Sequence, residues 1–240
     1  ALFFLIYFLA TNDRFKYQLF RFPRINFSTV RQIFDISLFV MLQHFFSLAV
    51  WFVFFMIIEK MGERSLAIAN IIRSLYMVLM IPVWAFSSTT NTLVSNIIGE
   101  GLSEMVIPVI RKVTRITLFS VFLMIIPLLI IPGLFIRVYT PDASLIADSI
   151  PSVFVILGAT VIFALIQNMF SGISGTGNTR DALLIESLTL VGYLVVAWLI
   201  GIKLQQPITF VWFCEYFYYI ALGLISYYYM KSRRWEHKVI

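Results

Sequence analysis

Six long apolar segments follow one another along the chain, separated by short stretches of polar residues, glycine and proline. They cover residues 36–58, 66–90, 113–131, 150–170, 183–201 and 207–230. Each approaches the ~20 apolar residues that a helix needs to cross the hydrocarbon core of a bilayer. Transmembrane β-strands would instead alternate apolar and polar positions over about ten residues. The pattern therefore predicts an all-α integral membrane protein with a bundle of six transmembrane helices.

A shorter apolar run, "ALFFLIYFLA", occupies residues 1–10. As a helix it would reach only ~15 Å, about half the thickness of a bilayer core. It has no basic region before it and no clear cleavage site, so a signal peptide is not expected. We interpret it as the end of a truncated transmembrane helix, which would make the chain a piece of a longer protein.

Basic residues are distributed unevenly between the segments that separate the apolar runs. When these segments are numbered alternately, 13 Lys and Arg fall on one side and four on the other. Because cytoplasmic loops carry the excess of Lys and Arg, the linker at 11–35 and the tail at 231–240 are predicted to be cytoplasmic. The linker is partly amphipathic and interrupted by Pro23, as expected for a connector on the membrane surface between two helical bundles. These features predict a multi-pass protein of the plasma membrane, the inner membrane of a bacterial cell.

The composition agrees with a membrane environment and excludes several other classes. Hydrophobic residues make up 60% of the chain and charged residues 12%, whereas a soluble domain carries about 25% charged residues. Anionic lipid head groups account for the net charge of +6, so no nucleic-acid partner is expected. The single cysteine, Cys214, and the distant His44 and His237 form no disulfide framework or metal-ligand pattern. We therefore expect no metal and no cofactor.

The stretch "GISGTGNTRDALLIESL", residues 172–188, contains three closely spaced glycines, Gly172, Gly175 and Gly177. Their spacing differs from the dinucleotide-binding fingerprint, and the lysine of a phosphate-binding P-loop is absent. The flanking segments are transmembrane helices rather than a strand and a helix. We interpret the stretch as a tight cytoplasmic turn in which Asn178 or Thr179 caps the next helix.

Two motifs in this part of the chain resemble a known family. "SGTGNTR", residues 174–180, resembles the cytoplasmic turn between the tenth and eleventh helices of the multidrug and toxic compound extrusion (MATE) transporters. Residues 66–101 resemble the eighth helix of that family, with a run of small polar residues after Pro82 and closing glycines at Gly99 and Gly101. The number of spans, the basic linker and the charge asymmetry also fit the C-terminal lobe of such a transporter.

The resemblance implies two six-helix lobes that face each other across a central cavity. It implies secondary active efflux of drugs or other small organic molecules, often cations, in exchange for H⁺ or Na⁺ by alternating access. The partners would be membrane lipid and the missing N-terminal lobe. Many members couple transport through a Glu in helix seven and an acid in helix ten. The matching positions here are Ser47 and either Phe163 or Ala164. A coupling Asp of helix one, used by other branches, would lie outside this chain.

Polar and ionisable residues at membrane depth are the candidates for the cavity, because their burial costs free energy. The helical spacing of the first two spans groups these residues on one face of each helix. The candidates are Gln43, His44, Ser47, Trp51, Asn70, Arg73, Met77, Trp84 and Gln167. Hydrogen bonding between helices or ordinary packing would explain the same residues equally simply.

Three titratable residues are candidates for binding the coupling ion. Glu215 lies ~12 Å inside the last span, at a depth similar to that of Arg73. It would serve either as the partner of Arg73 in an ion pair or as a proton site. Glu186 is a further candidate. Alternatively, Glu186 is an interfacial group that lies near the helix N-terminus or near Arg180. His44 could carry a proton or be structural.

Other functions fit the sequence less well. A lipid-linked oligosaccharide flippase of the same wider superfamily would need a cationic cavity for pyrophosphate, and Arg73 is the one deep arginine. A membrane-embedded enzyme would need a cluster of catalytic residues, and His44 has no partner visible in the sequence. We expect no enzymatic activity. A membrane scaffold would not need a continuous polar face on two helices.

Overall fold

The structure, a computed structural model, describes residue 7, residues 26–233 and residue 235. The expected helix end at 1–10, apart from residue 7, therefore lies outside the described residues. So do residues 11–25 of the expected linker and most of the expected tail after Arg233. The chain divides into two units, Ala1–Asp35 and Ile36–Ile240, and the second contains almost all of the helical bundle.

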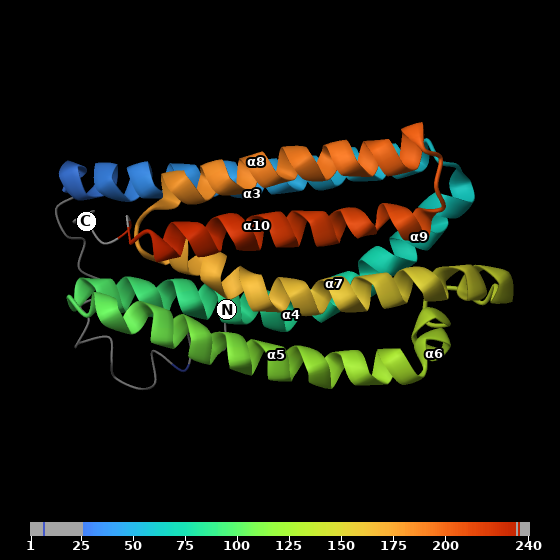
Figure 1. The fold of residues 1–240 in the computed structure, drawn as a ribbon, viewed down its shortest axis with the longest axis horizontal. Coiled ribbons are helices and arrows are strands. Elements are labelled where there is room, and N and C mark those ends of the chain that lie inside the picture. Colours follow the sequence, from blue (N-terminus) through green and yellow to red (C-terminus); the bar gives the residue numbers. More distant parts are fainter. Residues whose placement is uncertain (1–6, 8–25, 234, 236–240) are drawn as a thin grey trace. The chain divides into compact units, whose positions relative to one another are not determined.

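The described residues form long helices joined by short turns (Figure 1). The long helices are α3 (Phe27–Glu59), α4 (Glu63–Gly99), α5 (Val106–Ile130), α7 (Ala143–Gly175), α8 (Thr179–Trp198) and α10 (Phe213–Lys231). Shorter elements are a 3₁₀-helix (Ser103–Met105), α6 (Pro132–Ile136), a π-helical turn (Leu199–Lys203) and α9 (Ile208–Val211). Six helices within the described part are long and apolar enough to cross a membrane. This confirms the predicted all-α class with six transmembrane helices.

Each helix overlaps one of the expected segments, but several extend well beyond it. Helix α4, for example, continues to Gly99 rather than ending near residue 90. The added turns follow a run of hydroxyl side chains that bond to carbonyls of their own helix. Thr89 donates to Ala85 O at 2.9 Å, and Thr92 donates to Ser88 O at 3.2 Å. These bonds satisfy the hydroxyls internally, so a polar sequence remains helical at membrane depth.

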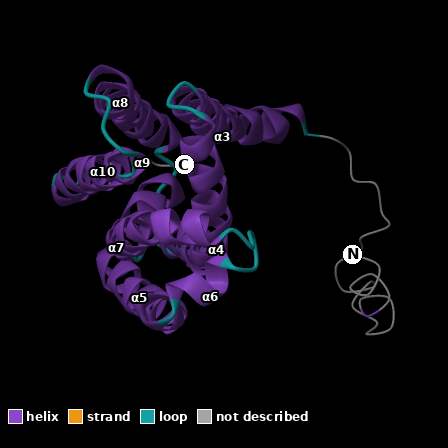
Figure 2. Cartoon of the chain, turned by 90° about the vertical axis from the view of Figure 1, so that its right-hand side faces the viewer, coloured by secondary structure: helices purple, strands orange, loops and turns teal. Residues whose placement is uncertain are grey.

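The helix α7 occupies the centre of the bundle. Viewed from one end, it lies between α10 and α5, with α4 beside it (Figure 2). The contact with α4 is close because Gly175 has no side chain, and a Cβ there would lie 2.8 Å from the carbonyl oxygen of Asn91. Small residues at a helix interface allow this approach, which gains van der Waals contact in a bilayer.

Small polar groups connect α4 to α7 along this contact, which we call the α4–α7 seam. The hydroxyls of Ser87 and Ser171 hydrogen-bond to each other. Thr90 Oγ1 donates to Asn168 Oδ1 at 3.0 Å, and Ser95 Oγ donates to the carbonyl of Gly175 at 2.9 Å. The seam is defined by Ser87, Thr90, Asn91, Ser95, Asn168, Ser171 and Gly175.

The glycine-containing stretch forms the turn between α7 and α8. Gly177 has a φ of +80°, a left-handed conformation that glycine adopts without steric cost. Asn178 occupies the position before α8, as expected, but its side chain donates to Thr176 Oγ1 at 2.8 Å instead of capping a helix N–H. Asp181 lies in the first turn of α8 and accepts a 2.6 Å hydrogen bond from Tyr229.

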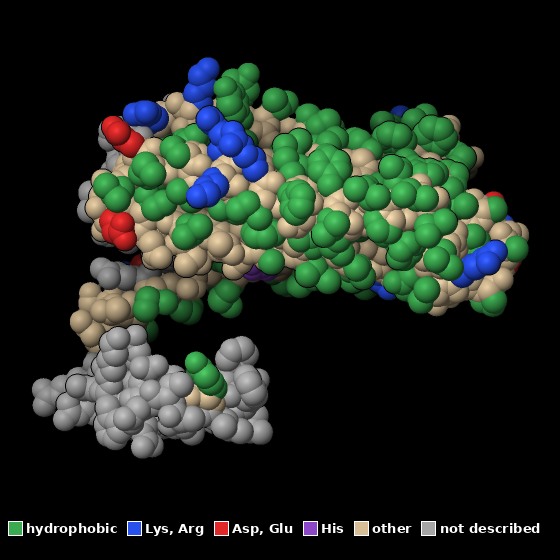
Figure 3. Space-filling model, turned by 90° about the horizontal axis from the view of Figure 1, so that it is seen from below, with side chains coloured by type: hydrophobic (Ala, Val, Ile, Leu, Met, Phe, Trp, Pro, Cys, Tyr) green, Lys and Arg blue, Asp and Glu red, His purple; other side chains and the backbone are tan. Residues whose placement is uncertain are grey.

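Hydrophobic side chains cover most of the face shown in Figure 3, and Lys and Arg gather toward one end of it. That is the end at which α5 begins and α10 finishes, with Arg111, Lys112, Arg115 and Lys231. At the other end, Arg64 and Asp148 form an ion pair at 2.5 Å between the starts of α4 and α7. An apolar surface between charged ends is typical of a multi-pass membrane protein.

Candidate functional site

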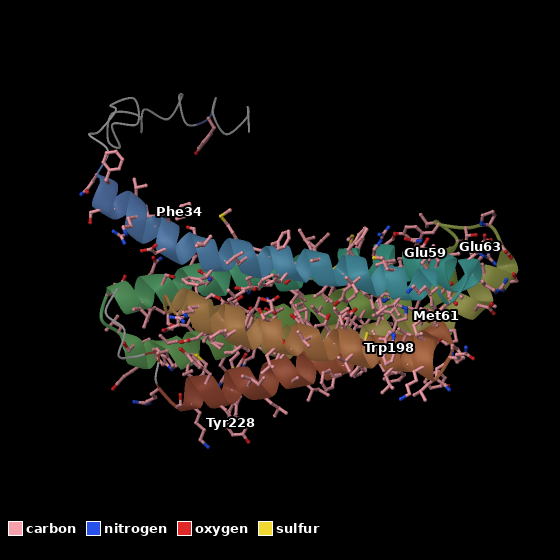
Figure 4. The ribbon with its side chains drawn as sticks, turned by 90° about the horizontal axis from the view of Figure 1, so that it is seen from above. Phe34, Glu59, Met61, Glu63, Trp198 and Tyr228 are labelled. Carbon is pink, nitrogen blue, oxygen red and sulfur yellow. The ribbon has the colours of Figure 1, made fainter. Side chains whose placement is uncertain are left out.

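A cavity of about 810 Å³ lies among α3, α4, α7, α8 and α10. Figure 4 shows the helices that surround it. Glu59, Met61 and Glu63 mark the turn between α3 and α4 at one end of the bundle, and Tyr228 of α10 lies toward the other end. Most of the residues expected to form a cavity do line it: Gln43, His44, Ser47, Trp51, Met77, Trp84 and Gln167. Glu186 and Glu215, which were expected as coupling-ion candidates, line it as well.

Helix α3 contributes one continuous face to this cavity. Gln43, Ser47 and Trp51 are spaced by one helical turn, and His44 lies beside them. The indole of Trp51 stacks on the ring of Tyr76 from α4, with ring centroids 5.9 Å apart and an interplanar angle of 11°. The stacking fixes an aromatic surface on the cavity wall.

Glu186 joins three helices within the membrane. Its carboxylate lies on α8 and accepts a 2.6 Å hydrogen bond from Ser47 of α3. Tyr218 of α10 donates to the same oxygen at 3.4 Å. Glu186 is only 7% exposed, and its Oε2 has no hydrogen-bond partner; Oε1 of the neighbouring Gln43 has none either. The alternative interpretation of Glu186, an interfacial group near the helix N-terminus or near Arg180, does not fit a side chain that is buried and lines the cavity.

Glu215 is the second carboxylate of the cavity and is 2% exposed. It lies in the first turn of α10 and accepts a 3.1 Å hydrogen bond from Tyr193 of α8. The proposed ion pair with Arg73 is not formed, since the Arg73 guanidinium lies 4.9 Å above the ring of Phe55. Equal depth in two helices did not make these residues neighbours, because α4 contacts α10 through Tyr76, whose hydroxyl hydrogen-bonds to that of Tyr219, whereas Arg73 contacts α3.

Tyrosine side chains fill the space between the two carboxylates. The rings of Tyr193 and Tyr218 meet edge to face, with centroids 5.9 Å apart. Each of them donates to one of the two glutamates. We call Ser47, Glu186, Tyr193, Glu215 and Tyr218 the carboxylate wall. It connects α3, α8 and α10 through groups that can bind a proton or a small cation.

Two of the expected residues do not line the cavity. Asn70 donates to the carbonyl of Leu66 in its own helix at 3.0 Å. Arg73 makes the contact with Phe55 described above. Gln167 does line the cavity and also donates to Ser87 at 3.3 Å, so it connects the cavity to the seam.

Part of the polar lining was not predicted from the sequence. The missed polar residues are Tyr76, Ser87, Ser88, Asn91, Thr92, Ser171, Ser174, Tyr193, Tyr218 and Tyr219. The polar run of α4 was visible, but only as a family motif. The tyrosines gave a weaker signal, since an isolated Tyr in a transmembrane helix also suits a lipid-facing position near the membrane surface.

The ionisable side chains of the cavity lining are mostly acidic. Its ionisable groups are Glu186, Glu215, His44 and the weakly acidic tyrosines, and the described lining residues include no Lys or Arg. No cluster of three or more His, Cys, Asp or Glu that could hold a metal ion occurs in the described part of the chain.

Comparisons with known proteins agree with this architecture. A family model described as MatE matches residues 37–199, which run from α3 to the end of α8. The fold is similar to that of a MOP superfamily transporter from Pyrococcus furiosus, for which the polarity of the binding pocket suggested a different function. The TM-score is 0.75 at 15% sequence identity, over 85% of this chain and 45% of that one. No curated protein sequence matches.

Proposed function

The chain belongs to the MatE family of membrane transporters, and we propose that it forms one lobe of an exporter of small organic cations. The export is driven by entry of H⁺ or Na⁺, and the cavity is exposed to each side of the membrane in turn. The observation that carries the proposal is a membrane-depth cavity with two buried carboxylates, aromatic walls and no lysine or arginine among its described lining.

The lining suits organic cations of varied shape. Trp51, Tyr76 and Trp84 offer aromatic faces to a positive charge. Met77 and Met80 add flexible apolar surface, which adapts to different ligands. Glu186 and Glu215 provide the negative charge that a cationic substrate needs after it leaves water.

The same carboxylates explain how an ion could drive transport. Coupling requires that the ion and the substrate favour different states of the protein. A proton or Na⁺ bound at Glu186 would compete with a cationic substrate and would change the contacts of α3, α8 and α10 together. We therefore assign the coupling ion first to Glu186, with Glu215 as the second site and His44 as a neighbouring polar group.

The chain spans 45% of the length of the similar transporter from P. furiosus. We propose that a second lobe completes the cavity. The excess of Lys and Arg supports a cytoplasmic position for the linker and the end of α10, in the plasma membrane. The flippase alternative would need a cationic cavity, and Arg73 packs on Phe55 outside the lining.

The test is transport by the full-length protein in proteoliposomes loaded with a fluorescent organic cation. A pH gradient and a Na⁺ gradient are imposed separately. We expect efflux with one gradient, and loss of that efflux in E186Q and E215Q but not in E100Q, which alters an exposed carboxylate outside the cavity. A folded protein that gives no efflux under either gradient would contradict the proposal and favour a lipid-linked substrate.

A further inference from the structure

A second cavity, of about 890 Å³, lies at the basic end of the bundle, between the start of α5 and the end of α10. Helix α7 forms its floor, as its position between α5 and α10 in Figure 2 allows. None of its lining residues belongs to the first cavity. It is therefore a separate site, and its function does not depend on the proposed transport substrate.

The mouth of this cavity is strongly cationic. Four basic side chains line it, Arg111, Arg115, Lys231 and Arg233, against one carboxylate, Glu104. Arg111 and Arg115 lie one turn apart on the same face of α5. Two guanidinium groups so close to each other repel unless an anion lies between them, and guanidinium binds phosphate through paired hydrogen bonds.

The inner part of the cavity is apolar and opens toward the lipid. Its walls include Leu118, Leu165 and Met169. Leu118 lies roughly 18 Å along α5 from the first residue of that helix. The cavity therefore extends from the head-group region into the hydrocarbon core. Leu165 is 48% exposed and Ile107, another lining residue, is 38% exposed. Apolar walls that extend this far would not contribute to the binding of a soluble anion.

We propose that this cavity binds one anionic phospholipid. The phosphate lies among Arg111, Arg115 and Lys231, and an acyl chain lies along Leu118, Leu165 and Met169. Basic pockets between transmembrane helices select anionic head groups in this way, because the charge gives specificity and the acyl chain gives affinity. The buried Trp235, whose indole N–H donates to Met230 O at 3.0 Å, also lines the cavity.

The test measures lipid retention by the full-length protein with native mass spectrometry, using phosphatidylglycerol and phosphatidylcholine of identical acyl chains. We expect preferential retention of one phosphatidylglycerol molecule. R111Q/R115Q should weaken this binding roughly 10- to 30-fold, because the loss of each cation should weaken it about five-fold. R111K/R115K keeps the charge and should retain most of the binding.

The matched control is K112Q/R180Q, which removes two exposed cations from the same end of the bundle without altering the cavity lining. This variant should bind phosphatidylglycerol as the unmodified protein does. Should R111Q/R115Q fail to fold, K231Q alters the site from another helix, and we expect about five-fold weaker binding.

Three further outcomes would overturn the proposal. Equal retention of both lipids, or an equal loss in the control, would show that the cations of the cavity do not select the lipid. Displacement of the lipid by inorganic phosphate or glycerol phosphate would identify the site as one for a soluble anion.

Discussion

The α4–α7 seam and the carboxylate wall both hold polar groups at membrane depth, but they do so in opposite ways. The seam uses small neutral side chains, and both polar atoms of Asn168 are paired, with Thr90 at 3.0 Å and Thr117 at 2.9 Å. The wall uses long side chains, two of them carboxylates, and leaves Glu186 Oε2 unpaired. The seam hydroxyls of Ser87, Thr90, Ser95 and Ser171 are paired as well, as most buried polar groups in native proteins are. The wall therefore keeps a carboxylate oxygen available to a proton or a cation, whereas the hydrogen bonds of the seam join α4 to α7.

The largest effect is expected from E186Q in the wall. Glutamine can still accept the hydrogen bond from Ser47, so the free energy of unfolding should change by less than about 1 kcal/mol. Gradient-driven efflux should fall roughly 10- to 100-fold, the range of typical coupling energies, because an amide does not bind H⁺ or Na⁺ as a carboxylate does. Efflux in proteoliposomes and thermal unfolding measure the two properties separately. Unchanged efflux would place the coupling ion elsewhere.

The second effect is expected in the seam, from G175A. The added methyl group would meet the Asn91 carbonyl at 2.8 Å, which forces α4 and α7 apart. Overpacking of this kind costs about 1–3 kcal/mol of stability. The control is G99A, where nothing lies within 4 Å of the added atom. Equal unfolding midpoints for the two variants would show that the helices do not approach as closely as described.

A smaller effect is expected from N168L, which removes two hydrogen bonds of Asn168. Thr90 and Thr117 keep their bonds to Phe86 O and Val113 O in their own helices. The loss should therefore be about 1 kcal/mol, as for other hydrogen bonds between membrane helices. A double-mutant cycle with T117V isolates the single pair, and strict additivity would contradict a direct interaction.

The smallest effect is expected at Asp142, which caps α7 outside the membrane. Hydrogen bonds from the Ser144 side chain and backbone, and from Leu145 N, hold the pKa of Asp142 below its usual value of 3.8. Because the pKa is lowered on folding, this stabilisation is present above the usual value and is lost as the pH falls through the lowered one. D142A should lower the unfolding temperature slightly at pH 7, and the difference from the unmodified protein should shrink below pH 4. A difference independent of pH would exclude a charged cap.

The sequence predicts the helical bundle well because each transmembrane helix carries its own apolar signal. The family also follows from local motifs, since "SGTGNTR" and residues 66–101 each lie within one turn or helix. The MatE match over residues 37–199 confirms that assignment.

The details of the cavity depend on how the helices are rotated against one another, which local patterns do not specify. Depth alone suggested that Arg73 pairs with Glu215, but Glu215 contacts Tyr193, and Arg73 contacts Phe55. The bond between Ser47 and Glu186 joins residues 139 positions apart. Neither residue alone indicates that contact, although both are polar groups at membrane depth.

The six crossings of the bundle also have a consequence for how such a protein can be assembled and can evolve. An even number of antiparallel spans brings the chain back to the side of the membrane on which the first span began. In Figure 1 the end of α10 accordingly lies at the same end of the bundle as residues 36–40 of α3. A bundle with an even number of spans can be duplicated, and the two copies can be joined by a connector that does not cross the bilayer. Each copy can then insert according to its own charges, without reversing the orientation of the other.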